Sequence, residues 1–156
     1  MCDLTDAPYL SLDIGQYLQS LQNQLLLIVD LIPDDKLNWT PKHDLWNARG
    51  ILIHMSDVRD RWLANGVQDG EPYPNVWQTA RTKDDLKREL DRTYQRLTRF
   101  LTSAVQLDAT YPDPGYPQSL RSGHWLAFQL LEHDIHHRAE LLQRLALLDI
   151  AHGIDL

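Results

Sequence analysis

The last long segment of the chain, residues 122–148, decides the fold and reads SGHWLAFQLLEHDIHHRAELLQRLALL. Its leucines recur at intervals that match the turn of an α-helix, about 3.6 residues. On a helix they line one side: Leu126, Leu130, Leu141, Leu145 and Leu148. A helix with one apolar side is stable when that side packs against other helices. The segment therefore predicts a helix that belongs to an all-α bundle.

Three earlier segments show the same periodicity, over residues 11–31, 46–65 and 83–105. Prolines lie between the segments, and Pro33 ends the first because the residue before a proline avoids the helical conformation. No stretch alternates between apolar and polar residues for long enough to predict a strand. The sequence therefore predicts an all-α protein with four long helices, which is a four-helix bundle.

Short motifs predict where these helices begin and end. We expect Ser11 to cap the first helix, and Thr82 with Asp85 to form a capping box at the start of the third. Gly66 is expected to follow the end of the second helix, in the left-handed conformation that glycine favours.

The connections are longer than simple turns. Residues 66–82 and 107–120 contain several prolines and no helical periodicity. A bundle whose helices alternate up and down needs only short connections. We therefore expect long crossover loops, one of them between the second and third helices.

Composition narrows the class of protein. A chain of 156 residues suits a single domain over residues 1–156, and its formal charge of −7 disfavours binding to nucleic acid or to an anionic membrane. The single cysteine, Cys2, excludes an internal disulfide and a zinc site built on several thiolates. No signal peptide and no apolar run of about 20 residues is present, so we expect a cytoplasmic protein.

Three histidines form the candidate functional site. His133 and His137 lie one helical turn apart on the leucine-lined side of the last helix, so their rings can converge on one ion. His54 borders the apolar side of the second helix, and packing of the two helices would bring it to the pair. Neutral imidazoles suit zinc, nickel, iron(II) or copper. Three protein ligands leave a position open for water or substrate, which is typical of a catalytic site.

Other interpretations of these patterns stay open. Each histidine could be an ordinary core residue with a hydrogen-bond partner. Asp134 stands where a zinc peptidase motif has its glutamate, and no glutamate precedes a histidine by three residues as in di-iron bundles, so both classes are disfavoured. We expect the basic stripe of the third helix to be a solvated face with ion pairs, formed by Arg88, Arg92, Arg96 and Arg99.

Three stretches carry a resemblance to a known family. They are LIPDDKLNW at 31–39, ILIHMSD at 51–57 and HDIHHRAE at 133–140. In these three stretches, taken together, the chain resembles the DinB/YfiT-like family of metalloenzymes. The resemblance implies an up-down-down-up four-helix bundle, often a homodimer, in which His54, His133 and His137 hold a divalent metal ion. Zinc or nickel is the expected metal, with iron or manganese next.

The leading hypothesis is a metal-dependent enzyme, a thiol S-transferase or a hydrolase, that acts on a small molecule and uses a low-molecular-weight thiol in the first case. Four charged residues lie near the ligands in the sequence: Asp57, Arg61, Arg138 and Glu140. A carboxylate among them would orient an imidazole through its second nitrogen. The alternative is a non-catalytic helical scaffold or a stress-response interaction protein.

Overall fold

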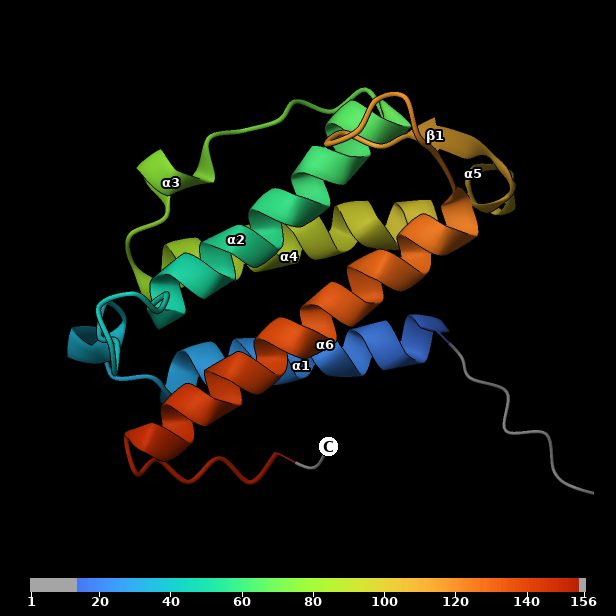
Figure 1. Ribbon diagram of the computed structural model, residues 1–156. Coiled ribbons are helices and arrows are strands. Elements are labelled where there is room, and N and C mark those ends of the chain that lie inside the picture. The colour runs from blue at the N-terminus through green and yellow to red at the C-terminus, as the bar shows by residue number, and fades with distance from the viewer. Residues whose placement is uncertain (1–13, 155–156) are drawn as a thin grey trace, which may run out of the picture.

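The computed structural model describes residues 14–154 and shows a four-helix bundle (Figure 1). The long helices are α1 (Ile14–Leu31), α2 (Ala48–Arg61), α4 (Lys83–Leu101) and α6 (Gly123–Leu147). In Figure 1, α1 and α6 run in one direction, and α2 and α4 run in the opposite one. Around the bundle α1 contacts α4, α4 contacts α2, α2 contacts α6 and α6 contacts α1. The predicted up-down-down-up bundle is therefore confirmed.

The connection between α2 and α4 spans the length of the bundle. Because these two helices run parallel, the chain must return from the end of α2 to the start of α4 (Figure 1). It does so along the outside, through the single-turn helix α3 (Val76–Thr79). This is the crossover loop that the prolines between the second and third helices predicted.

The connection between α4 and α6 contains a short hairpin that the sequence did not predict. Helix α5 (Ala104–Asp108) leads into strands β1 (Thr110–Pro112) and β2 (Leu120–Ser122), which pair antiparallel with Tyr111 opposite Arg121. Each strand has three residues, which is too short for a period of two to stand out in the sequence. The expectation of no strand was therefore wrong for this connection.

Side-chain caps fix the helix starts. The capping box of Thr82 and Asp85 is present and begins α4. Asn47 accepts a hydrogen bond from the Gly50 N–H, so α2 begins at Ala48 rather than at residue 46. Ser103 caps α5 in the same way, and this divides the helix predicted over residues 83–105. Ser11, the predicted cap of the first helix, lies outside the described residues.

The end of the second helix differs from the prediction. The chain continues as a π-helical turn, Trp62–Val67, and the left-handed residue after it is Gln68, with φ of 56°. Gly66 lies inside the turn. A Cβ at Gly66 would lie 3.2 Å from the Trp62 ring and 3.4 Å from the Pro112 carbonyl oxygen. Gly66 therefore allows close packing on the hairpin instead of ending the helix.

The predicted apolar sides form the core. Leu126, Leu130, Leu141 and Leu145 of α6 are fully buried, whereas Leu148 is half-buried. The core also contains leucines of α1 and α4, such as Leu25 and Leu90. Burial of one such side chain contributes about 1.5–3 kcal/mol. No helix within residues 14–154 is both long enough and apolar enough to cross a membrane.

The arginine stripe of α4 departs from the predicted solvated face. Arg96 is 1% exposed and forms ion pairs with Asp60 of α2, at 2.7 Å, and with Asp69 of the crossover, at 2.6 Å. Arg92 also pairs with Asp60. The α2 helix and the crossover cover this side of α4, so only the outer arginines, Arg88 and Arg99, remain largely exposed.

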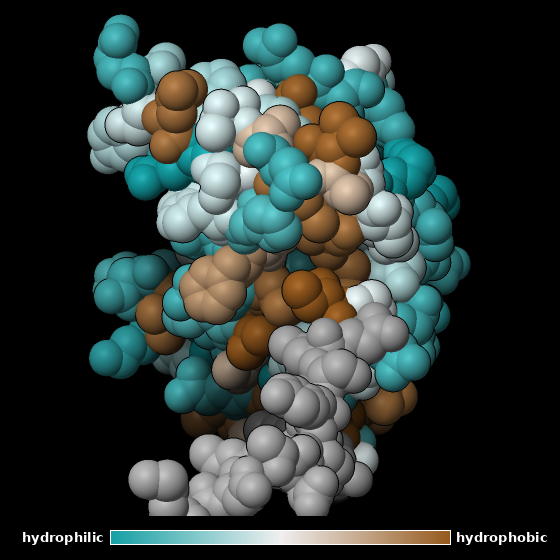
Figure 2. Space-filling view, turned by 90° about the vertical axis from the view of Figure 1, so that its right-hand side faces the viewer, coloured by the Kyte–Doolittle hydropathy of each residue, from teal (hydrophilic) through white to brown (hydrophobic). Residues whose placement is uncertain are grey.

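Apolar side chains gather on the end of the bundle where α1 begins (Figure 2). A cavity of about 260 Å³ lies there between α1, α4 and α6. Its wall includes Leu18, Leu101 and Leu131, and Phe128 is 66% exposed beside it. This cavity shares no lining residue with the histidine site described next.

Candidate metal centre

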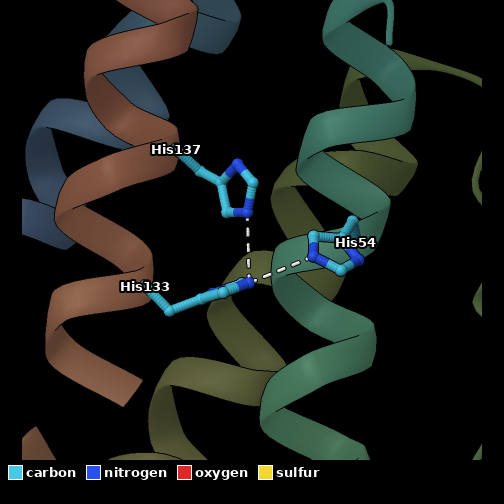
Figure 3. A group of neighbouring side chains, drawn as sticks. All are labelled: His54, His133 and His137. Atoms are coloured by element: carbon cyan, nitrogen blue, oxygen red, sulfur yellow. Dashed lines mark hydrogen bonds between the residues drawn. The ribbon is translucent and has the colours of Figure 1, made fainter. Parts of the chain in front are cut away.

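The structure brings together the three histidines that the sequence singled out (Figure 3). The Nε2 atom of His133 lies 3.1 Å from Nε2 of His54 and 3.1 Å from Nε2 of His137. One nitrogen from each ring lies within 4.8 Å of the others. Three ring nitrogens from two helices therefore share one small volume.

The helices explain this convergence. His133 and His137 are four residues apart on α6, so their side chains project from the same face, one turn apart. His54 projects from α2, which packs beside α6. The three rings lie between the two helices (Figure 3). The side chains of His133 and His137 are 15% and 11% exposed, so the site is mostly buried but open on one side.

The contacts at His133 fit a shared cation better than hydrogen bonds alone. A ring nitrogen carries either one proton or one in-plane lone pair, so it makes one well-directed hydrogen bond. Nε2 of His133 has two equally close nitrogen neighbours. Two nitrogens bound to tetrahedral zinc at about 2.0–2.1 Å are about 3.4 Å apart. The observed 3.1 Å separations need only a small adjustment to hold an ion, so the donor set fits a divalent metal.

The surroundings favour neutral imidazoles. Burial, together with the neighbouring His133 and His137, lowers the pKa of His54 to about 4. Burial also lowers the pKa of His137, although the hydrogen bond with Glu140 acts in the opposite direction. Metal binding needs a free lone pair on each ring. His54 and His137 therefore favour the deprotonated form that metal binding needs.

Glu140 orients one of the rings. Its Oε2 lies 2.7 Å from Nδ1 of His137. An ionised carboxylate only accepts, so Nδ1 carries the proton and Nε2 keeps its lone pair. Among the candidates named from the sequence, Glu140 is the one placed to do this. Asp57 accepts a hydrogen bond from Tyr73, and Arg138 donates to Gln24.

A buried carboxylate that sequence reasoning missed lies under the second ring. Oδ1 of Asp134 is 3.7 Å from Nδ1 of His133. Both atoms are buried and have no hydrogen-bond partner among residues 14–154. The other oxygen of Asp134 accepts from Arg59. The adjacency of His133 and Asp134 in the sequence was visible, but it did not indicate that both side chains face inward.

A cavity of about 260 Å³ opens beside the histidines. Trp46, just before α2, packs edge-on against His54 with ring centroids 4.5 Å apart. Its position in the cavity wall depends on the fold and not on a local sequence pattern. The cavity is lined by Asp44, Leu45, Trp46, Ile51, His54, His137, Glu140 and Arg144.

Among the remaining histidines, His136 lies beside the three-histidine cluster: its ring centroid is 5.0 Å from that of His137, and it could share an ion with His137 and Glu140. His43 is exposed, and His124 is exposed beside Asp108. His152 is half-buried and accepts a hydrogen bond from the N–H of Ile154. His136 has a 66% exposed side chain near Glu140.

Comparisons with known proteins agree with this fold. The family model of the DinB superfamily matches residues 17–141. A DinB-like protein from Bacillus subtilis superposes with a TM-score of 0.70 at 20% identity, covering 92% of this chain and 95% of that one. A crystal structure assigned to the DinB family, from Exiguobacterium sibiricum, superposes with a TM-score of 0.68 at 17% identity, covering 92% and 96%. No curated protein matches the sequence. Because the family model matches most of this chain, the chain belongs to the DinB superfamily.

Proposed function

We propose that this protein is a metal-dependent enzyme that binds one divalent ion through Nε2 of His54, His133 and His137 and acts on a small molecule. The observation that carries the proposal is the convergence of three imidazole nitrogens in one small volume beside an open cavity. Zinc and nickel suit three imidazoles best, and iron or manganese follow.

The ligand count favours catalysis over a purely structural role. Structural zinc sites are closed by four protein ligands, whereas catalytic sites keep a position open. Here three histidines contribute one ligand nitrogen each. Glu140 does not add a fourth ligand, because its carboxylate is hydrogen-bonded to Nδ1 of His137, on the other side of that ring. A divalent ion in such a site lowers the pKa of a bound water or thiol, which serves hydrolysis or thiol transfer.

The side chains around the cluster have separate tasks in this proposal. Glu140 holds the proton on Nδ1 of His137 and so keeps Nε2 aimed at the ion. Trp46 fixes the ring of His54 from the cavity side and excludes part of the solvent. The cavity admits the substrate next to the histidines.

Metal titration tests the proposal. Protein purified without an affinity tag is stripped of metal, and zinc, nickel and cobalt(II) are then added while the bound stoichiometry is measured. We expect one ion per chain for the wild type and none for the His133→Ala/His137→Ala double variant. A His124→Ala variant, which removes an exposed histidine of the same helix beside Asp108, should bind as the wild type does. Unchanged stoichiometry in the first variant contradicts the proposal.

Thermal unfolding with and without chelator separates catalysis from the scaffold alternative. If the metal served only to stabilise the bundle, its removal would lower the Tm and no activated ester or thiol-acceptor substrate would be turned over. Turnover that depends on the added metal and is lost in the double variant supports the enzyme.

A further inference from the structure

Arg144 forms part of the cavity wall that also contains His54 and His137. The residue is 5% exposed. Its guanidinium has five N–H donors. The structure gives it one weak hydrogen bond, from Nη2 to the Trp46 carbonyl oxygen at 3.4 Å. Its Nε is buried without a partner among the described residues. Arg144 therefore presents largely unused donors in a buried position beside the site.

The other buried arginines show that this is unusual for the protein. Arg59 pairs with Asp134, and Arg96 pairs with Asp60. For Arg144, no carboxylate oxygen of residues 14–154 lies within 4.0 Å. A buried cation without a counter-charge is costly, so the missing negative charge points to a bound anion.

Arg138 provides an internal comparison. It lies on the same helix, is 9% exposed and also has no carboxylate within 4.0 Å in the described part of the chain. However, its Nη1 donates to Gln24 at 2.6 Å, and it does not line the histidine cavity. Among the arginines of residues 14–154, only Arg144 combines a guanidinium without a carboxylate partner with a place in this cavity wall.

The geometry limits the size of the anion. Arg144 follows His137 by seven residues, so both lie on one face of α6, about 10.5 Å apart along the helix axis. A cavity of about 260 Å³ is smaller than those that hold drug-sized ligands, which start near 300 Å³. A short molecule can therefore reach from the histidines to Arg144, and a large one cannot be enclosed.

The cavity charges favour a carboxylate. Asp44 and Glu140 also line the wall and would repel a dianion such as a phosphate ester more strongly than a monoanion. The planar guanidinium matches the two oxygens of a carboxylate. We propose that the small ligand of the histidine site carries a carboxylate that pairs with Arg144. This inference rests on the proposed metal site and assigns its substrate or thiol to the class of small carboxylic acids.

The test compares two thiols that differ in one group, mercaptopropionate and mercaptopropanol, on the cobalt(II)-loaded protein. Binding is followed by the absorption that appears when a thiolate ligates cobalt. In the wild type we expect mercaptopropionate to bind about 10- to 100-fold more tightly. In Arg144→Gln the two affinities should become nearly equal, with the affinity for mercaptopropanol and the cobalt stoichiometry unchanged. Arg138→Gln should keep the wild-type preference.

The outcomes are distinguishable. A preference that persists in Arg144→Gln means that the carboxylate binds cobalt itself, and it overturns the role of Arg144. Equal affinities in the wild type also overturn it, while the metal site stands. No cobalt uptake overturns the proposed function and this inference with it. If the glutamine variant does not fold, as judged by circular dichroism, Arg144→Met keeps the apolar stem and takes its place.

Discussion

Arg59 of α2 donates hydrogen bonds from Nε and Nη2 to the same oxygen of Asp134 on α6, at 3.0 and 2.7 Å. Both side chains are completely buried. Asp134 follows His133 directly, and Arg59 lies five residues beyond His54. Nη1 of Arg59 donates to the Thr93 hydroxyl and to the Leu90 carbonyl oxygen, both on α4. This ion pair therefore fixes the two histidine-bearing helices against each other next to the candidate metal site.

Removal of one partner of this pair should be strongly destabilising. In Arg59→Met the carboxylate of Asp134 is left buried and uncompensated, so the free energy of unfolding should fall by about 3–5 kcal/mol. The exposed ion pair of Arg88 with Asp85 is the control, and Arg88→Met should change stability by no more than about 1 kcal/mol. Urea unfolding measures both. An Arg59→Met variant as stable as Arg88→Met would show that the pair does not hold the helices together.

The carboxylate of Glu140 should influence metal affinity more than stability. Glu140→Gln removes the charge beside Nδ1 of His137, and zinc should bind about 10- to 100-fold more weakly. Glu132→Gln changes an exposed glutamate of the same helix and should leave affinity unchanged. Competition with a chromogenic chelator gives both values. Equal affinities for the two variants would remove Glu140 from the site.

Trp46 should report metal binding by fluorescence. Its ring centroid lies 4.5 Å from that of His54, so a quenching ion such as nickel or copper at the histidines would be close to the indole. We expect the metal to quench part of the emission of the wild type and much less of the emission of Trp46→Phe. Trp125→Phe serves as the control because Trp125 packs against Trp62 near the hairpin. Identical quenching in Trp46→Phe and the wild type would place the ion elsewhere.

Asp69 should make stability depend on acid pH. Burial raises its pKa, but hydrogen bonds from the Arg96 side chain and the Glu71 N–H outweigh burial, so the pKa lies below the ordinary 3.8. The unfolded chain therefore binds this proton more readily. The contribution of Asp69 is complete above pH 3.8 and is lost as the pH falls toward the folded-state pKa. The difference in unfolding free energy between the wild type and Asp69→Asn should shrink over this acid range, and a difference independent of pH would contradict the prediction.

Local patterns in the sequence were enough for the bundle and for the pair of His133 and His137. The leucines of α6 repeat with the helical turn, and His133 and His137 share that side, so their meeting requires only a helix. His54 meets this pair only if α2 packs against α6, and the family resemblance implied that packing. The resemblance also predicted the up-down-down-up order of the helices.

Features that depend on how distant segments pack were missed. Burial of Arg96 follows from the crossover loop that covers α4, and nothing in the arginine spacing distinguishes it from exposed Arg88. The π-helical turn that contains Gly66 packs against the hairpin, which lies far from it in the chain. Arg144 shares a face with His137, but its lack of a carboxylate partner is a tertiary property that no local pattern records.

His54 and His133 are 79 positions apart in the chain. An ion held by both is a reversible cross-link, and it closes a loop that contains the whole crossover and α4. By analogy with a disulfide over the same span, such a closure restricts the unfolded chain by up to about 4.5 kcal/mol. The availability of the metal would thus influence how stably the protein stays folded, in addition to the reaction at the site.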